Sequence, residues 1–375
     1  MDRIQMVDLK SQYLKLKDDI DNEIQKVLES TAFINGPQVK EFASALNNFQ
    51  GSQCTITCGN GTDALQIAMM ALDFKPGKEV IVPAFTYVAT VEVIALLHLK
   101  PIFIDVDPDT FNLDMDQLEG KITKDTAGIV PVHLYGQCAD MESIMKIAGS
   151  HNISVIEDSA QALGSVFAFA DGNTFKAGTM GHIGTTSFFP SKNLGCYGDG
   201  GAIFTNDAEL GEKIRMIANH GQKMKYYHDV VGVNSRLDTL QAAVLKAKLR
   251  YLDEYAIARN KVATYYDEKF KGIEGVLVPH RSKKSTHVFH QYTVKVENGQ
   301  RDALSSYLLS KGIPTMIYYP LPLHLQKAYR GFGFKEGDFP IAERLCNEVI
   351  SLPIHTEITA EMSKYIADSV IDFFD

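Results

Sequence analysis

The sequence has little cysteine, with five residues in 375, and these form no recognisable pattern. Their spacing matches neither the paired C-x-x-C of a zinc site nor the dense pairing of a small disulfide-bonded scaffold. The histidines at His133, His151, His182 and His220 are likewise scattered, without the spacing of metal ligands. We therefore expect no metal site, and reduced thiols as in a cytoplasmic protein.

An excess of basic residues and long apolar runs are missing as well. The net charge is −9 with no evident basic face, which argues against a nucleic-acid partner. No apolar run approaches the length that spans a bilayer, and the stretch from Met1 to Lys17 is charged where a signal peptide is apolar. We expect no membrane partner, because 45% hydrophobic and 22% charged residues are ordinary for a soluble globular enzyme.

Short apolar runs alternate with amphipathic segments between residues 54 and 219. The runs predict strands and the segments predict helices. The predicted strands are Thr55–Cys58, Val80–Val82, Pro101–Asp105, Gly128–His133, Ser154–Glu157, Thr185–Phe189 and Ala202–Thr205. This alternation is typical of an α/β protein with a mainly parallel sheet and helices on both faces. An inserted hairpin is predicted over Phe167–Gly181.

A long helix is predicted after the sheet, from Leu237 to about Lys271. Beyond it, predicted strands at Val288–Val296 and Thr315–Tyr318 alternate with helices, which indicates a smaller α/β unit. We place the boundary inside the long helix, so that residues 1–245 form a large domain with N-terminal helices and residues 246–375 a small one.

One lysine has unusual surroundings. The run from Thr185 to Phe189 is apolar, β-branched or aromatic, and it is followed by Pro190, by Lys192 and by four glycines between residues 195 and 201. Such a lysine lies at the end of a buried strand, on backbone that can approach a ligand closely. An ε-amine in that setting can lose its proton and attack a carbonyl. An ordinary lysine in a surface turn is the alternative.

Two further motifs suit a charged ligand. Gly59-Asn60-Gly61-Thr62-Asp63 joins a strand to a helix, where glycine amides and the helix N-terminus can bind a phosphate. The alternative is plain turn and cap chemistry. Glu157-Asp158 ends a predicted strand, where open α/β sheets bind ligands. A buried Asp158 needs a cationic partner, and a pyridinium nitrogen is one possibility, with a helix cap as the alternative.

Aromatic and anion-binding residues complete the set. Phe85 and Tyr87 follow another predicted strand, where either could stack on a flat ring or belong to the core. Asn234 and Arg236 precede the long helix and could bind a phosphate or a carboxylate, whereas Asp238 suits a helix cap. Together these motifs describe a flat, cationic, phosphorylated heterocycle held by a lysine, which is pyridoxal phosphate.

The chain resembles the DegT/DnrJ/EryC1/StrS family of nucleotide-sugar aminotransferases over nearly its whole length, from Asp8-Leu9 to Ser351-Leu352-Pro353. The stretch from Ser187 to Ala202 carries the resemblance most specifically. The resemblance implies the aspartate-aminotransferase fold of pyridoxal-phosphate enzymes (fold type I). It also implies a homodimer whose active sites are shared between the subunits.

The resemblance assigns roles residue by residue. Lys192 matches the Schiff-base lysine, Asp158 the carboxylate that pairs with the pyridine nitrogen, and Gln161 a contact to the ring face or its 3′-oxygen. The stacking aromatic is matched by Tyr87, and the phosphate ligands by Gly61, Thr62, Ser187 and, from the partner subunit, Asn234. The candidate substrate contacts are Arg236, also in trans, and His324, for which a hydrogen-bonded loop histidine is the alternative.

The retained Lys192 implies transamination, since a dehydrating branch of the family has histidine there. The implied donor is L-glutamate, and the implied acceptor is C3 of UDP-2-acetamido-2-deoxy-3-oxo-glucuronate, on a route to surface polysaccharide such as lipopolysaccharide O-antigen. A dTDP-3-keto-6-deoxyhexose is an alternative, because relatives acting on such sugars share the histidine of Pro320–His324. A 4-keto sugar and a non-catalytic regulatory protein on the same scaffold are further alternatives.

Overall fold

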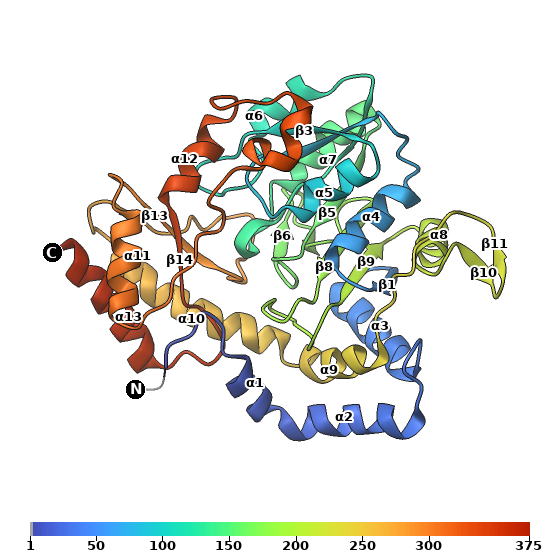
Figure 1. Cartoon of the computed structure of the whole chain (residues 1–375), viewed down its shortest axis with the longest axis horizontal. Coiled ribbons are helices and arrows are strands. Elements are labelled where there is room, and N and C mark those ends of the chain that lie inside the picture. Colours follow the sequence, from blue (N-terminus) through green and yellow to red (C-terminus); the bar gives the residue numbers. More distant parts are fainter. Residues whose placement is uncertain (1–2) are drawn as a thin grey trace.

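The computed structural model describes residues 3–375 and has a seven-stranded sheet at its centre (Figure 1). The strands are β1 (Cys54–Cys58), β2 (Glu79–Pro83), β3 (Lys100–Ile104), β4 (Thr126–Ile129), β5 (Ser154–Asp158), β8 (Ile183–Ser187) and β9 (Gly201–Thr205). Their order across the sheet is β1-β9-β8-β5-β4-β2-β3, and β9 runs in the direction opposite to that of the other six. The predicted α/β fold with a mainly parallel sheet is confirmed.

Helices cover the sheet on both faces, which explains why its strands read as continuous apolar runs. The covering helices are α4 (Gly61–Ala71), α5 (Ala89–Leu96), α7 (Met141–His151) and α8 (Ala208–Ala218). In β2, Val80 and Val82 pack into one hydrophobic cluster with α4 and α5, while Ile81 packs into another with α7. Successive side chains of a strand point to opposite faces, so a strand that is buried on both faces has apolar residues at successive positions.

The predicted N-terminal helices are present, whereas the helix predicted after the sheet is interrupted. Residues 9–30 form α1 (Leu9–Lys15) and α2 (Lys17–Ser30), followed by α3 (Pro37–Gln50). The predicted long helix after the sheet is wrong, because it is two helices, α9 (Thr239–Leu249) and α10 (Leu252–Phe270), along the lower side of Figure 1. Both α9 and the start of α10, at Leu252 and Tyr255, pack in one cluster with α2 and α3, whereas α10 from Val262 on packs with the C-terminal sheet.

A three-stranded antiparallel sheet forms the core of the C-terminal unit, with β13 between its two partners. Its elements are β12 (Val276–Leu277), β13 (Tyr292–Val296), α11 (Arg301–Ser310), α12 (Pro340–Glu348), β14 (Val349–Leu352) and α13 (Ala360–Phe374). The predicted strand Val288–Val296 is half right, since residues 288–291 precede the strand. The predicted strand Thr315–Tyr318 is wrong: Met316 alone forms a bridge, to Ser351.

Two hairpins stand apart from these sheets. The predicted inserted hairpin is confirmed, with β6 (Val166–Ala168) and β7 (Thr174–Lys176) as its strands. The second, β10 (Gln222–Met224) with β11 (Tyr227–His228), projects at the right edge of Figure 1. The remaining short elements are α6 (Met115–Leu118), η1 (Glu119–Lys121), η2 (Leu134–Gly136), η3 (Leu323–Leu325) and η4 (Lys327–Phe332).

The C-terminal segment reaches back into the core of the large sheet. Phe339 and Leu345 belong to the same hydrophobic cluster as Val80 and Phe103. Asp105, at the end of β3, accepts hydrogen bonds of 2.8 Å from the amides of Ile341 and Ala342 at the start of α12. The division at residue 245 thus remains a prediction. Within residues 3–375, no helix combines the length and apolar character needed to cross a membrane.

Candidate active site

The carboxyl ends of the parallel strands bring most of the predicted site residues to one edge of the sheet. In open α/β sheets this edge is where ligands bind. The strands β5 and β8 are direct neighbours, with Asp158 opposite Thr185. The site residues that follow the strands are Gly61 and Thr62 after β1, Tyr87 after β2, Asp158 and Gln161 at and after β5, and Ser187 and Lys192 at and after β8.

Lys192 lies in a tight turn after β8, where its amide donates to the carbonyl of Phe189 at 2.8 Å. The turn needs Gly195, because a Cβ there would lie 2.3 Å from the carbonyl oxygen of Pro190. The lysine is half-buried, with its amine surrounded by protein. Burial lowers the pKa of Lys192 to about 8, against the opposing pull of the Asp158 carboxylate. A useful fraction of the amine is therefore unprotonated and nucleophilic near neutral pH.

Asp158 is a buried carboxylate, 6% exposed, held by neutral donors. Its Oδ2 accepts from the hydroxyl of Thr90 at 2.9 Å, and its Oδ1 accepts from the amide of Ala160 at 3.2 Å. Within residues 3–375 Asp158 forms no ion pair, and the residues after it form a turn, which removes the helix-cap alternative. Because a buried charge needs a partner, the protonated ring nitrogen of pyridoxal phosphate fits this position.

The neighbouring carboxylate, Glu157, points to the other face of β5 and has a different function. It accepts hydrogen bonds from the amides of Gly178, Met180 and Gly181 at 2.6–2.8 Å and pairs with His133 at 2.9 Å. The Nδ1 of His133 accepts from the amide of Ala139, so the proton on Nε2 is donated to Glu157. This satisfied network fixes the strand that carries Asp158.

The predicted phosphate cup forms where α4 begins beside the end of β8. Asn60 caps the helix by accepting from the amide of Asp63 at 2.8 Å. A Cβ on Gly61 would lie 2.7 Å from the Cβ of Ser187, so the two residues are in direct contact and only glycine fits. The free amides of the first helical turn, with the hydroxyls of Thr62 and Ser187 nearby, suit a phosphate group.

Gln161 connects the cup edge of the sheet to the C-terminal unit. Its Oε1 accepts from the amide of Tyr135 at 2.7 Å, and its Nε2 donates to the hydroxyl of Tyr319 at 3.1 Å. The ring of Tyr319 lies 6.2 Å from that of Tyr87, which is 57% exposed and open to a stacking partner. Sequence reasoning missed Tyr319 and Thr90, although both occur within or next to segments it singled out.

The remaining predicted residues are Asn234, Arg236 and His324. Asn234 is exposed and Arg236 half-buried, and within residues 3–375 Arg236 has no ion pair. Between them, Ser235 accepts from the amide of Gly59 at 2.9 Å and so ties the segment to the cup of its own chain. His324 is buried, with Nε2 2.9 Å from Glu343 and its ring packed on Phe339. Its alternative, a hydrogen-bonded histidine, describes this placement, and a substrate contact stays a prediction.

Asp238 occupies the N-cap position of α9, as expected, but without a side-chain hydrogen bond to the helix.

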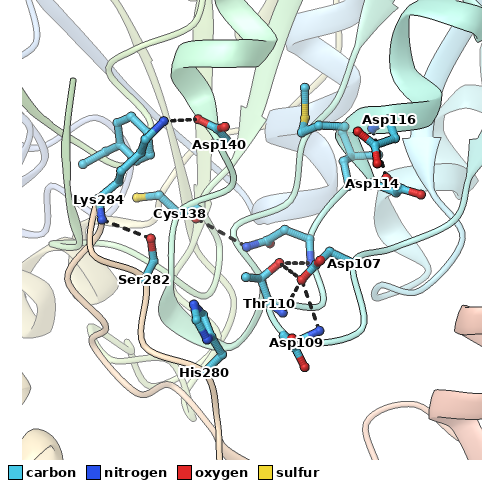
Figure 2. A pocket seen from close by; sticks show the side chains of 14 residues that line it. Asp107, Asp109, Thr110, Asp114, Asp116, Cys138, Asp140, His280, Ser282 and Lys284 are labelled. Atoms are coloured by element: carbon cyan, nitrogen blue, oxygen red, sulfur yellow. Dashed lines mark hydrogen bonds and ion pairs between the residues drawn. The ribbon is translucent and has the colours of Figure 1, made fainter. Parts of the chain in front are cut away.

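A hollow of about 410 Å³ lies elsewhere, between the loop of residues 107–116 and the loop of residues 280–284 (Figure 2). None of the predicted site residues lines it. Two of its carboxylates have partners: Asp107 accepts from the amide and hydroxyl of Thr110, and Lys284 contacts Asp140 at 3.4 Å. Within residues 3–375 no group of three or more histidine, cysteine or acidic residues could hold a metal ion. The predicted site residues lie instead at and after the strand ends.

A lysine with its amine surrounded by protein, a buried carboxylate and a helix start suited to a phosphate, at the strand ends of this fold, are the features of a pyridoxal-phosphate-dependent aminotransferase of fold type I. Residues 14–371 match the model of the DegT/DnrJ/EryC1/StrS aminotransferase family, and the chain belongs to that family. Solved aminotransferase structures that are 26–30% identical to the chain hold pyridoxal phosphate or pyridoxamine phosphate, and pyridoxal phosphate is the cofactor.

Three similar proteins frame the comparison. The chain is 46% identical over 363 residues to UDP-2-acetamido-2-deoxy-3-oxo-D-glucuronate aminotransferase of Pseudomonas aeruginosa, covering 97% of this chain and 98% of that one. It is also 46% identical over 373 residues to the "Pleiotropic regulatory protein" of Geobacillus stearothermophilus, covering 99% and 98%. The structure of DesV from S. venezuelae with a ketimine intermediate superposes with a TM-score of 0.96 at 36% identity, covering 100% and 99%.

We expect pyridoxal phosphate and borohydride to label Lys192. The pKa of about 8 leaves this amine partly free at neutral pH, so labelling should rise as the pH is raised through 8. Peptide mapping by mass spectrometry should place the pyridoxyl group on Lys192, and the Lys192→Ala protein should bind the cofactor without a covalent link. A label found mainly on another lysine, such as the partly buried Lys176, would contradict the assignment.

Replacing Asp158 by asparagine should slow transamination about 100-fold, which corresponds to about 3 kcal/mol. Asparagine keeps the shape and can still meet Thr90, but it loses the anion that holds a proton on the ring nitrogen. Single-turnover kinetics measures the effect. Thr90→Val is the matched control, because it removes the hydrogen bond and leaves the charge, and it should cost far less. An Asp158→Asn rate within threefold of wild type would reduce Asp158 to a structural role.

Proposed function

We propose that the protein transfers an amino group from L-glutamate to C3 of UDP-2-acetamido-2-deoxy-3-oxo-glucuronate, or of a closely related nucleotide-linked 3-keto sugar. The observation that carries the reaction type is the dry Lys192 amine beside the buried, unpaired Asp158 at the carboxyl edge of the sheet. Support for the sugar comes from the Pseudomonas aeruginosa relative, whose 46% identity extends over 97% of this chain.

When bound, pyridoxal phosphate supplies an electron sink for the carbanion that forms at the amino-bearing carbon. Lys192 binds the cofactor first and, once displaced by the amino donor, takes the proton from the donor Cα as a general base. Asp158 keeps the ring nitrogen protonated, because a nearby anion favours the charged form, and Thr90 holds the carboxylate in place. In the second half-reaction Lys192 returns a proton to C3 of the sugar.

The other residues of the edge bind and orient. The amides at the start of α4, together with Thr62 and Ser187, would hold the phosphate. Hydrogen bonds to Tyr135 and Tyr319 fix the side chain of Gln161, so that its position does not depend on a bound cofactor. Gln161 would there contact the cofactor ring. The exposed ring of Tyr87 would stack on the heterocycle and exclude water from one face.

A panel of keto sugars distinguishes the candidate substrates. We expect the pyridoxamine phosphate form of the protein to return to the pyridoxal form with UDP-linked 3-keto sugars, followed by absorbance, and fastest with the 2-acetamido uronate. Turnover confined to dTDP-3-keto-6-deoxyhexoses or to 4-keto sugars would contradict the proposed acceptor. Turnover of no sugar, with Lys192 still labelled, would favour a regulatory protein, the role named in the Geobacillus relative.

We further propose a homodimer in which Asn234 and Arg236 act in the partner's site. The exposed Asn234, and a guanidinium at Arg236 without an ion pair within residues 3–375, leave both side chains available to a neighbouring subunit. In an isologous two-fold contact each subunit lends the same segment to the other. Arg236 would there bind a carboxylate, of glutamate or of the sugar acid.

Mixing two inactive variants tests this arrangement. Lys192→Ala and Arg236→Ala subunits, allowed to exchange, should regain about a quarter of wild-type activity, because half of the dimers are mixed and each mixed dimer has one intact site. Lys192→Ala mixed with Asp158→Asn is the matched control and should regain nothing, since both defects lie in a chain's own site. No recovery in the first mixture, with exchange confirmed by native mass spectrometry, would place Arg236 in its own subunit's site or outside any site.

A further inference from the structure

Two cations are buried in the helix pair that follows the cup segment. Lys248 on α9 is 1% exposed and Arg259 on α10 is 3% exposed. Within residues 3–375 neither forms an ion pair with a carboxylate. Burial lowers the pKa of Lys248 to about 8 and that of Arg259 to about 10, and the charge of Arg259 lowers the pKa of Lys248 further. Burying two neighbouring cations without an anion lowers the stability of the folded state, and a pair of apolar side chains would lower it less.

The ammonium group of Lys248 binds the turn that carries Lys192. Its Nζ donates to the carbonyl of Gly195 at 2.5 Å and lies 5.5 Å from the ring centroid of Tyr197. Gly195 is the residue with no room for a side chain against Pro190. A charge-assisted hydrogen bond to a buried carbonyl is stronger than a neutral one. Lys248 therefore fixes the far side of the Lys192 turn.

Arg259 holds a second segment, residues 287–291, in the same way. Its guanidinium donates to the carbonyls of Phe289 at 3.0 Å and of Ile354 at 2.9 Å. Phe289 has a φ of 45°, a backbone conformation that residues other than glycine seldom adopt. Contacts with the surrounding structure must therefore stabilise it. These bonds explain why residues 288–291 do not continue the strand β13.

The two held segments meet beside Lys192. The side-chain amide of Asn193 donates to the carbonyl of Val288 at 3.0 Å. His290, in the second segment, is buried and near enough for the charge of Lys192 to lower its pKa further below the ordinary value, after burial itself. The charged or titratable groups that face Lys192 are thus Asp158 from β5 and His290 from the segment before β13.

We propose that Lys248 and Arg259 are positioning residues, which clamp the segments on the two sides of Lys192 and so keep water from its amine. The proposal rests on the proposed function only in taking Lys192 as the reacting amine. Such a role would explain why these two positions carry buried charges, although apolar side chains could occupy them without loss of stability.

The titration of Lys192 in the cofactor-free, full-length protein tests this role. Competitive acetylation across pH, read by mass spectrometry, should give a wild-type midpoint near 8. Lys248→Met loosens the turn, so the midpoint should rise towards that of a hydrated lysine, and Lys192 labelling at neutral pH should fall about tenfold for each unit. Lys246→Met is the matched control, because this lysine lies two residues before Lys248 on α9 and contacts Glu23 and Glu41 at the surface. Its loss should leave the titration midpoint of Lys192 unchanged.

Arg259→Lys separates position from charge. It keeps a buried cation but cannot span the same carbonyls, so it should raise the Lys192 midpoint in the same direction although the charge is conserved. It also decides the question if Lys248→Met does not fold. An unchanged midpoint in either folded variant would overturn the proposal and leave both cations purely structural. That result is independent of where the pyridoxyl label falls, which is the measurement on which the proposed function depends.

Discussion

The site depends on burying an amine and a carboxylate near each other. Burial drives the Lys192 amine towards its neutral form, while Asp158 pulls it back towards the charged form, and the pKa of about 8 is the balance. More water would restore an ordinary lysine, and closer contact would lock the two groups in an ion pair. The adjacent strands β5 and β8 set this separation, because they fix where each side chain leaves the sheet.

The one antiparallel strand serves the same end. Because β9 runs back from the carboxyl edge, the segment of residues 188–200 begins and ends at one register pair, Ser187 opposite Gly201. A lysine placed on such a closed loop is anchored at both ends by sheet hydrogen bonds. The cup is built onto this pair, with Gly61 against Ser187 and the carbonyl of Asn60 against Gly201. The segments predicted to hold the phosphate and the aldehyde of the cofactor are thus joined to the same pair of strands.

The sequence predicted the sheet and the placement of Lys192 and Asp158 at and after neighbouring strands, because each rests on a local signal: an apolar run, a glycine turn or a carboxylate at a strand end. The roles of the two residues stay predictions. Features set by distant contacts could not be predicted from the sequence. Helical periodicity continues across Arg250 and Tyr251, where α9 ends and α10 begins, and it does not record that α10 passes from the core of α9 to that of the C-terminal sheet. Sequence spacing also cannot predict contacts between residues that are not neighbours in the chain. Examples are the pairing of His324 with Glu343 and the hydrogen bond from Gln161 to Tyr319.

The return of the last third of the chain to the large sheet bears on how the protein folds during synthesis. Phe103 at the end of β3 completes its aromatic packing with Phe334 and Phe339, and the carboxylate of Asp105 meets amides that follow it by more than two hundred residues. Until these residues leave the ribosome, the nascent sheet has one incompletely covered flank. An emerging chain with exposed apolar surface is a substrate for chaperones and prone to aggregate. The segment from Phe334 to α12 therefore completes the cover of this flank, and a chain cut before Phe334 would leave apolar residues of the large sheet exposed.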